Sequence, residues 1–236
     1  MLRSTAGGAI RHAMLAAVLA LLPSAAGAQA KIDVDLELIL AIDCSASVDE
    51  REYELSMQGI AKALRDDEVV EAIERFTPNG IAILLVHWSG WHAQQVSAVE
   101  WTRVSDRASA EALATEVENT PRALSGDTSI GGLLRYAKTH LEIGPFQGAR
   151  QIVDVAGDGE GSSGDSPDHY RDAVVAAGAT INGLAVLNEF PTLDRYYAER
   201  VIGGPEAFVV AAQDYDDFAR AMRRKLLQEI RGAPLG

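Results

Sequence analysis

The run Asp43-Cys44-Ser45-Ala46-Ser47 places three oxygen-bearing side chains at alternate positions, directly after an apolar stretch. At the carboxyl end of a strand, this spacing puts the Asp and both Ser side chains on one side of a turn. Carboxylate and hydroxyl oxygens suit a hard divalent cation such as Mg²⁺. Asp and Ser are also common in turns and helix caps. The run therefore becomes a candidate metal site only if other loops supply the missing ligands.

Two other loops could supply them. Thr128 lies in Gly126-Asp127-Thr128-Ser129, directly before a predicted helix, and Asp158 follows a predicted buried strand. Ligands of open α/β sheets bind beyond the carboxyl ends of the central strands, where all three loops would meet. Two carboxylates and three hydroxyls balance the charge of a dication. Because Mg²⁺ takes about six oxygens and usually keeps waters, at least one position would stay open to a carboxylate from a partner.

The segments that would hold these loops alternate between strand and helix. Apolar runs predict strands at 36–42, 81–88, 96–101, 152–156, 181–187 and 208–211. Amphipathic segments predict helices at 49–65, 109–117, 130–141, 168–177 and 193–202, and a closing helix from 214 onward. Only a short segment around Gly90 separates the second and third strands, so these two should form an antiparallel hairpin at a sheet edge. The pattern predicts an α/β fold: a doubly wound, mostly parallel, Rossmann-like sheet with one antiparallel edge strand and helices on both faces.

Residues 1–30 have the pattern of a secretory signal peptide, and residues 31–236 form the predicted domain. Arg3 and Arg11 make the start basic, residues 13–22 are apolar, and small residues at 26–30 offer a cleavage site after Ala28 or Ala30. Ten apolar residues would form a helix of roughly 15 Å, about half of a bilayer core, so a permanent membrane span is not expected. An uncleaved N-terminal anchor is the alternative.

The charge of the predicted mature chain excludes several classes of partner. Without Arg3 and Arg11 the chain keeps 19 basic and 34 acidic side chains, a formal charge of −15. Such a surface repels nucleic acid and anionic membranes but attracts cations. Cys44 is the only cysteine, so an intramolecular disulfide is impossible.

Taken together, the three loops resemble the metal-ion-dependent adhesion site of von Willebrand factor A (VWA) domains. In that family a D-x-S-x-S loop, a Thr from a second loop and an Asp after the fourth strand surround one Mg²⁺ or similar ion. The matching residues, in the family's order, are Asp43, Ser45, Ser47, Thr128 and Asp158. The resemblance spans roughly residues 34–232. It implies the VWA fold, a bound Mg²⁺ (or Mn²⁺ or Ca²⁺) and a protein partner that offers an Asp or Glu carboxylate to the ion.

Three shorter segments are similar to a group of exported bacterial proteins of unknown function that contain this domain. These segments are Val153 to Gly159, Ile181 to Leu184 and Val201 to Pro205. The likeness implies a periplasmic or secreted protein and names no partner.

Each candidate ligand also has a purely structural interpretation. Ser47 with Glu50 matches a helix capping box, and Thr128 or Ser129 could cap the helix that follows. A loop Asp such as Asp158 most often accepts hydrogen bonds from nearby backbone amides. These alternatives stay open at the level of sequence.

Several other residues near the loops are expected to serve packing rather than chemistry. Cys44 should be a buried, inert thiol, and Asp154, inside a strand, a hydrogen-bonded structural residue. Trp88, Trp91 and Trp101 cluster around the edge hairpin, where hydrophobic packing is favoured over a contact patch for carbohydrate or protein. The histidines show no zinc-binding spacing.

Two functions compete with that of a binding module. One is a metal-dependent hydrolase acting on phosphoesters, but no His or Lys adjoins the three loops to serve as a general base. A haloacid-dehalogenase-type phosphatase would need an acid where Ser45 stands. The other is a partner subunit of an ATPase machine, a role that export from the cell would disfavour. We therefore expect a binding protein and no enzyme.

Overall fold

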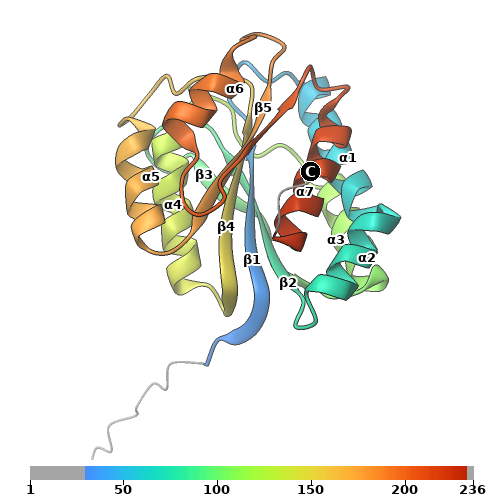
Figure 1. Cartoon of the computed structure of the whole chain (residues 1–236). Coiled ribbons are helices and arrows are strands. Elements are labelled where there is room, and N and C mark those ends of the chain that lie inside the picture. The colour runs from blue at the N-terminus through green and yellow to red at the C-terminus, as the bar shows by residue number, and fades with distance from the viewer. Residues whose placement is uncertain (1–29, 233–236) are drawn as a thin grey trace, which may run out of the picture.

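Six strands form one sheet in the order β3-β2-β1-β4-β5-β6 in the computed structural model, which describes residues 30–232 (Figure 1). The strands are β1 (Ile32–Asp43), β2 (Ile81–Trp88), β3 (Gln95–Val104), β4 (Phe146–Gly157), β5 (Thr180–Val186) and β6 (Val209–Ala212). Each neighbouring pair is parallel except β2 and β3, which are antiparallel. The predicted doubly wound sheet with one antiparallel edge strand is confirmed.

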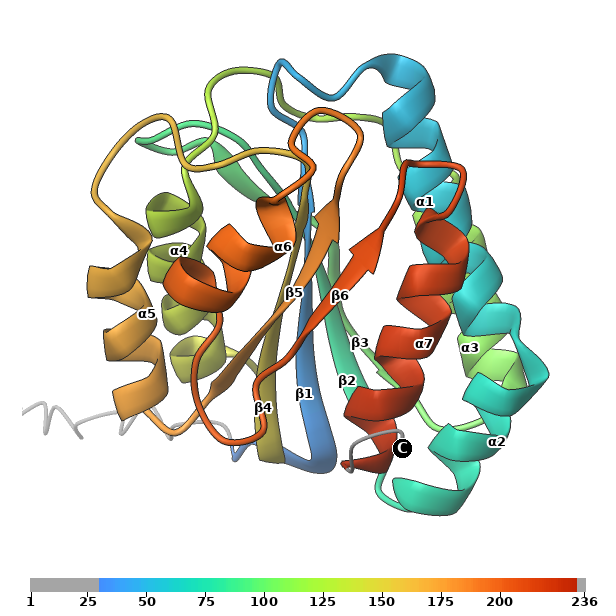
Figure 2. The ribbon, with the colours of Figure 1, turned by 45° about the horizontal axis from the view of Figure 1, so that its top comes forward.

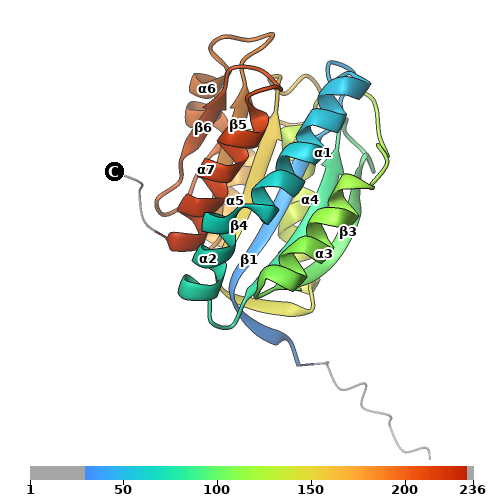
Figure 3. The same ribbon diagram turned by 90° about the vertical axis from the view of Figure 1, so that its right-hand side faces the viewer.

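Helices cover both faces of the sheet, as Figures 2 and 3 show. One face carries α1 (Glu50–Arg65), α2 (Asp67–Phe76), α3 (Arg107–Glu118) and α7 (Phe218–Arg231). The other carries α4 (Ile130–Ile143), α5 (Pro167–Ala176) and α6 (Leu193–Tyr196), which continues as the π-helical turn η1 (Tyr197–Val201). None of the helices within residues 30–232 is long and apolar enough to cross a membrane.

The central strand β1 is buried on both sides. Leu36, Leu38 and Leu40 belong to the core beneath α1 and α7, while Ile39 and Ala41 belong to the core beneath α4 and α5. Because successive side chains of a strand point to opposite faces, a strand covered twice must be apolar throughout. This explains the continuous apolar run in the sequence.

The two central strands, β1 and β4, end beside each other at the upper edge of the sheet in Figure 1. After β1 the chain crosses to α1 on one face, and after β4 it crosses to α5 on the other. The two connections diverge from the ends of adjacent strands, which is where open α/β sheets bind ligands.

The elements differ from the prediction mainly in their extent. Helix α2 was not predicted, although Asp66 caps it by accepting hydrogen bonds from the N–H groups of Glu68 and Val69. Strands β1 and β4 begin at Ile32 and Phe146, earlier than their apolar runs, because their first halves include exposed positions. The predicted signal peptide lies outside the described residues, apart from its last residue.

Candidate functional site

The structure places all five predicted ligands at the end of the sheet where β1 and β4 terminate. Asp43 is the last residue of β1, and Ser45 and Ser47 lie in the loop between β1 and α1. Asp158 follows the last residue of β4, and Thr128 lies in the loop between α3 and α4. Three segments far apart in sequence thus reach one end of the sheet.

Hydrogen bonds join four of these residues into one continuous chain. The Ser45 N–H donates to Asp43 Oδ1 over 2.7 Å, and the Ser45 and Ser47 hydroxyls lie 3.1 Å apart. The Ser47 hydroxyl donates to Asp158 Oδ1 over 2.9 Å. The side chains of the D-x-S-x-S loop therefore converge on the carboxylate that the second strand supplies.

The fifth residue, Thr128, is held against the Asp158 loop through its backbone. Its carbonyl oxygen accepts hydrogen bonds from the N–H groups of Ser162 (2.8 Å) and Ser163 (3.1 Å), and its own N–H donates to Ser162 Oγ over 3.0 Å. A Cβ built on Gly159 would lie 3.9 Å from Thr128 Oγ1. Thr128 is buried and its hydroxyl borders the loop that carries Asp158.

Two carboxylate oxygens at this site are buried without a hydrogen-bond partner. They are Asp43 Oδ2 and Asp158 Oδ2, on residues that are 3% and 0% exposed. Neither residue forms an ion pair with a Lys, Arg or His among residues 30–232. Burying charged oxygens unpaired is costly. A cation bound by these two carboxylates and the neighbouring hydroxyls would remove that cost, so the residues fit a divalent ion.

The same burial perturbs the protonation of both carboxyl groups. Burial, followed by the charge of Asp158, raises the pKa of Asp43 to about 7, although the Ser45 N–H and the nearby Arg122 guanidinium lower it in part. Burial also raises the pKa of Asp158, against the hydrogen bond from Ser47 and the nearby Tyr215 hydroxyl, which lower it. A bound dication favours the ionised form of its ligands and so opposes both upward shifts.

A glycine allows the two strands to approach beneath the site. A Cβ on Gly157 would lie 2.9 Å from Asp43 Oδ2 and 2.9 Å from the Tyr197 hydroxyl, closer than Cβ atoms are found. The Tyr197 hydroxyl is itself buried without a partner. Gly157 thus lets the Asp43 carboxylate and the Tyr197 hydroxyl both lie against the end of β4.

Arg122 is a component that the sequence prediction missed. Its Nη2 donates to the carbonyl oxygens of Cys44 (3.1 Å) and Ser45 (2.8 Å), and its Nε donates to the Leu124 carbonyl over 3.0 Å. The Ala46 N–H also donates to the Gly126 carbonyl over 2.7 Å. Arg122 therefore ties the D-x-S-x-S loop to the segment that leads to Thr128. A lone arginine in a loop carries no sequence signal for such a role.

The capping alternatives are resolved in favour of other residues. Asp49, rather than Ser47, is the N-cap of α1 and forms a capping box with Glu52, so the Ser47–Glu50 capping box is wrong. Ser129 caps α4 by accepting from the Gly132 N–H over 3.2 Å, so Thr128 does not serve as the cap. Ser47 and Thr128 are consequently free of helix capping.

The remaining chemical candidates are buried or dispersed. Cys44 is fully buried, and burial together with the Asp43 charge raises the pKa of its thiol to about 12, which makes a nucleophilic thiolate unfavourable. Trp88 is fully buried in the core, whereas Trp91 packs against Tyr170 and beneath the Arg135 guanidinium, so the tryptophans do not form one patch. Within residues 30–232, no three His, Cys, Asp or Glu side chains are grouped closely enough to hold a metal without hydroxyl ligands.

The fold is shared with several solved proteins. The proximal thread matrix protein 1 of the mussel byssus superposes with a TM-score of 0.62 at 15% identity over 85% of this chain and 48% of its own. A von Willebrand factor type A protein from Catenulispora acidiphila gives 0.60 at 17% identity over 85% and 43%. The manganese-loaded TRAP protein of Plasmodium vivax gives 0.53 at 16% identity over 84% and 73%. This chain spans about half the length of the first two proteins.

Comparison by sequence finds fewer related proteins than comparison by structure. Among curated proteins, none is detectably similar to this chain. Residues 33–234 match a family described as a protein of unknown function, DUF1194. Because that match covers most of the chain and the neighbouring structures are VWA domains, the protein belongs to the DUF1194 family and has the VWA fold.

Proposed function

We propose that this protein is an exported, non-enzymatic binding module in which a divalent cation bridges to a carboxylate of a protein partner. The ion is held by Asp43, Ser45, Ser47, Thr128 and Asp158. Mg²⁺ is the expected ion, with Mn²⁺ or Ca²⁺ as substitutes, because carboxylate and hydroxyl oxygens are hard ligands. Export to the periplasm or the exterior rests on the signal-like segment at residues 1–30.

The observation that carries the proposal is the pair of buried carboxylates with unpartnered oxygens. Asp43 Oδ2 and Asp158 Oδ2 lack hydrogen-bond partners, and no cationic side chain pairs with either residue within residues 30–232. Five side chains that act partly through water would leave a coordination position open, so the ion stays available to a sixth oxygen ligand. A carboxylate is the natural incoming group, because it carries the opposite charge.

The fold neighbours support the metal and the role in binding. One structure of the mussel matrix protein has a zinc-occupied metal-ion-dependent adhesion site, and the Plasmodium vivax TRAP protein is manganese-loaded. A pilus adhesin from Lactobacillus rhamnosus shares the fold with a TM-score of 0.57 at 12% identity, over 84% of this chain and 31% of its own. Catalysis is disfavoured because the hydrogen bonds at Asp43 and Asp158 come from serines and backbone and involve no His or Lys.

Calorimetric titration of the mature protein with Mg²⁺ and Mn²⁺ tests the proposal. We expect one ion per chain for the wild type and loss of that binding in Asp43→Ala. Asp33→Asn, at the opposite end of β1, is the matched control and should bind as the wild type does. Equal binding by Asp43→Ala and the wild type would show that the site is wrong. Turnover of phosphoester substrates that stops on chelation would instead favour a hydrolase.

A further inference from the structure

The loops around the candidate metal site differ sharply in charge from the loops at the other end of the sheet. The first group comprises residues 44–49, 89–94, 119–129, 158–166, 187–192 and 213–217, all at the carboxyl edge of the sheet. These loops contain one basic residue, Arg122, and nine acidic ones: Asp49, Asp127, Asp158, Glu160, Asp165, Glu189, Asp214, Asp216 and Asp217. The charge is therefore concentrated at the end of the molecule that holds the site.

The loops at the opposite edge are nearly neutral. They comprise residues 30–31, 77–80, 105–106, 144–145, 177–179 and 202–208. Within them lie the acidic residues Asp106 and Glu206 and the basic residue Lys31. The loops at the carboxyl edge are longer, 43 residues against 20, but length alone does not explain the contrast, because their net charge is −8 against −1.

The only basic side chain within these carboxyl-edge loops is already engaged. The Arg122 guanidinium donates to the carbonyl oxygens of Cys44, Ser45 and Leu124. It holds the loops together and does not project toward a partner. A docking protein would therefore meet loops whose charges are almost all negative.

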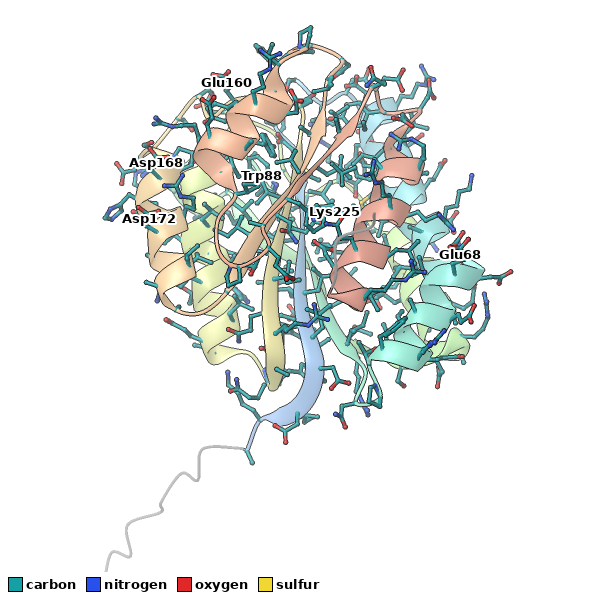
Figure 4. The ribbon with its side chains drawn as sticks, in the orientation of Figure 1. Glu68, Trp88, Glu160, Asp168, Asp172 and Lys225 are labelled. Atoms are coloured by element: carbon teal, nitrogen blue, oxygen red, sulfur yellow. The ribbon has the colours of Figure 1, made fainter. Side chains whose placement is uncertain are left out.

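Three of the acidic residues lie in loops around the site and have side chains that are not engaged by other residues of 30–232. Asp127, Glu160 and Glu189 come from three different loops, all are exposed, and none forms a side-chain hydrogen bond or ion pair with another residue of 30–232. Glu160 lies at the upper edge in Figure 4. The charge of Glu189 contributes to the raised pKa of Asp158, so this residue acts electrostatically on the site. We call Asp127, Glu160 and Glu189 the acidic rim.

The acidic rim restricts which carboxylates can approach. A dication neutralises Asp43 and Asp158, so the ion and these two ligands together carry no net charge to offset the rim. An incoming carboxylate adds a further negative charge among the remaining acidic side chains. Charges within the Debye length of about 8 Å repel one another at physiological salt. Juxtaposed like charges across an interface are strongly unfavourable, while complementary charges also speed association.

We propose that the metal site selects a polypeptide partner whose bridging Asp or Glu is surrounded by Lys and Arg side chains. The inference rests on the proposed function and adds the chemical character of the partner surface. The unpartnered oxygens of Asp43 and Asp158, both more than nine-tenths buried, provide the site for the ion. The acidic rim then provides the charge that the partner must complement.

Short peptides test this selectivity without a known partner. The probes are Lys-Lys-Gly-Asp-Gly-Lys-Lys, its analogue with Glu in place of every Lys, and the Lys peptide with Asn in place of Asp. Their affinities for Mn²⁺-loaded wild-type protein are measured by fluorescence anisotropy. We expect the Lys-flanked Asp peptide to bind about tenfold or more tightly than the Glu-flanked one, with a ratio that shrinks in 0.3 M salt. The Asn peptide should lose the metal-dependent part of its binding.

A matched pair of triple variants assigns the selectivity to the acidic rim. Asp127→Asn with Glu160→Gln and Glu189→Gln should reduce the affinity ratio to about threefold or less. Asp33→Asn with Glu71→Gln and Glu74→Gln removes the same number of charges from the opposite edge and from α2, and should leave the ratio unchanged. Urea unfolding of both variants confirms that each retains the fold.

The outcomes separate this inference from the proposed function. Equal affinity for the two Asp peptides, tighter binding of the Glu-flanked peptide, or an unchanged ratio in the rim variant would overturn the inference while leaving metal binding intact. If neither Asp peptide binds, the inference is also overturned. Failure of the proposed function would instead be seen in the calorimetric titration, where Asp43→Ala would bind the ion as the wild type does.

Discussion

Two pairs of buried carboxylates occupy the interior of this domain, and they are stabilised in opposite ways. Asp154 and Glu229, each 1% exposed, share the ammonium of Lys225, which is itself fully buried and lies 2.9 Å from Asp154 Oδ2. Lys225 lies between the sheet and α7 in Figure 4. Asp43 and Asp158 are buried to the same degree but have no cationic partner within residues 30–232. One pair carries its own cation, and the other is the pair that we propose binds a metal ion.

The Lys225 cluster contains more than the ion pairs. Asn182 Nδ2 donates to Glu229 Oε1 over 2.8 Å, and its Oδ1 accepts from the Phe208 N–H over 3.1 Å. The Lys225 ammonium also lies 5.1 Å from the centroid of the Phe208 ring. This cluster links α7 to β4 and β5. The comparison shows that carboxylates buried to a similar depth differ in whether the chain supplies their counter-charge.

The largest expected effect comes from removing that internal cation. Lys225→Met leaves two buried carboxylates uncompensated and should lower the free energy of unfolding by about 3–5 kcal/mol. Lys62→Met, on the exposed side of α1, should change it by less than about 0.5 kcal/mol. Urea unfolding measures both. If Lys225→Met costs less than about 1 kcal/mol, Lys225 is not the required partner of these carboxylates.

Removing a carboxylate from the other pair should have a different effect. Without metal at pH 8, Asp43→Asn should raise the free energy of unfolding by about 1–2 kcal/mol, because two buried like charges no longer repel. Saturating Mn²⁺, at a concentration about 100 times Kd, should stabilise the wild type by about 2.7 kcal/mol and the variant not at all. Thermal or urea unfolding with and without the ion compares them. Equal stabilisation of both proteins by Mn²⁺ would contradict the assignment.

The pH dependence of the free energy of unfolding tests the Lys225 cluster separately. Burial is the main cause that raises the pKa of Asp154 to about 7 from an ordinary value near 3.8, although Lys225 opposes the shift. The folded state therefore binds more protons than the unfolded state between these pH values, and the stabilising contribution is lost as pH rises from about 4 to about 7. Asp154→Asn should remove a decline of the order of 2 kcal/mol.

This measurement is made by urea unfolding at a series of pH values with saturating Mg²⁺, which under the proposed function compensates Asp43 and Asp158. The Asp33→Asn variant provides the baseline, since Asp33 is exposed. An identical pH profile for Asp154→Asn and the wild type would show that Asp154 does not titrate in this range.

The smallest effect concerns Arg122, whose guanidinium holds together the loops of the proposed ion site. Arg122→Gln removes the guanidinium that joins the Cys44 and Ser45 carbonyls to Leu124, and should weaken Mn²⁺ binding by about three- to tenfold, equivalent to about 1 kcal/mol. Arg122→Lys should recover part of the affinity. Arg195→Gln, exposed near the same edge, is the control. Calorimetry at fixed pH gives the affinities. Equal affinities in Arg122→Gln and Arg195→Gln would remove the positioning role.

Much of the architecture was predictable because it depends on local patterns. Buried parallel strands must be apolar on both faces, so β2 and the second half of β1 and β4 were recognisable. Helix α2 was missed although Asp66, Asp67 and Glu68 form an acidic start with an N-cap. The early residues of β1 and β4 were missed because their exposed side chains interrupt the apolar signal.

For the candidate site, the residues were predictable but their possible roles as helix caps could not be decided. The five oxygen-bearing residues were identified by type and spacing, and the structure places them in three connected loops. Their capping alternatives could not be separated, because Ser47, Asp49 and Ser129 are all good caps by residue type. Only the positions of the helix starts show that Asp49 and Ser129 take those roles.

From the sequence alone come the order of the strands and of the helices other than α2, and the identity of the oxygen donors at their ends. Both follow from short-range periodicity and from the chemistry of single residues. Tertiary structure decided which carboxylates have an internal cation, since Lys225 meets Asp154 only when α7 packs on the sheet. It also decided that Arg122 holds the D-x-S-x-S loop, a contact across 77 residues of chain. Pairing of charges depends on distance in space, which spacing along a chain does not specify.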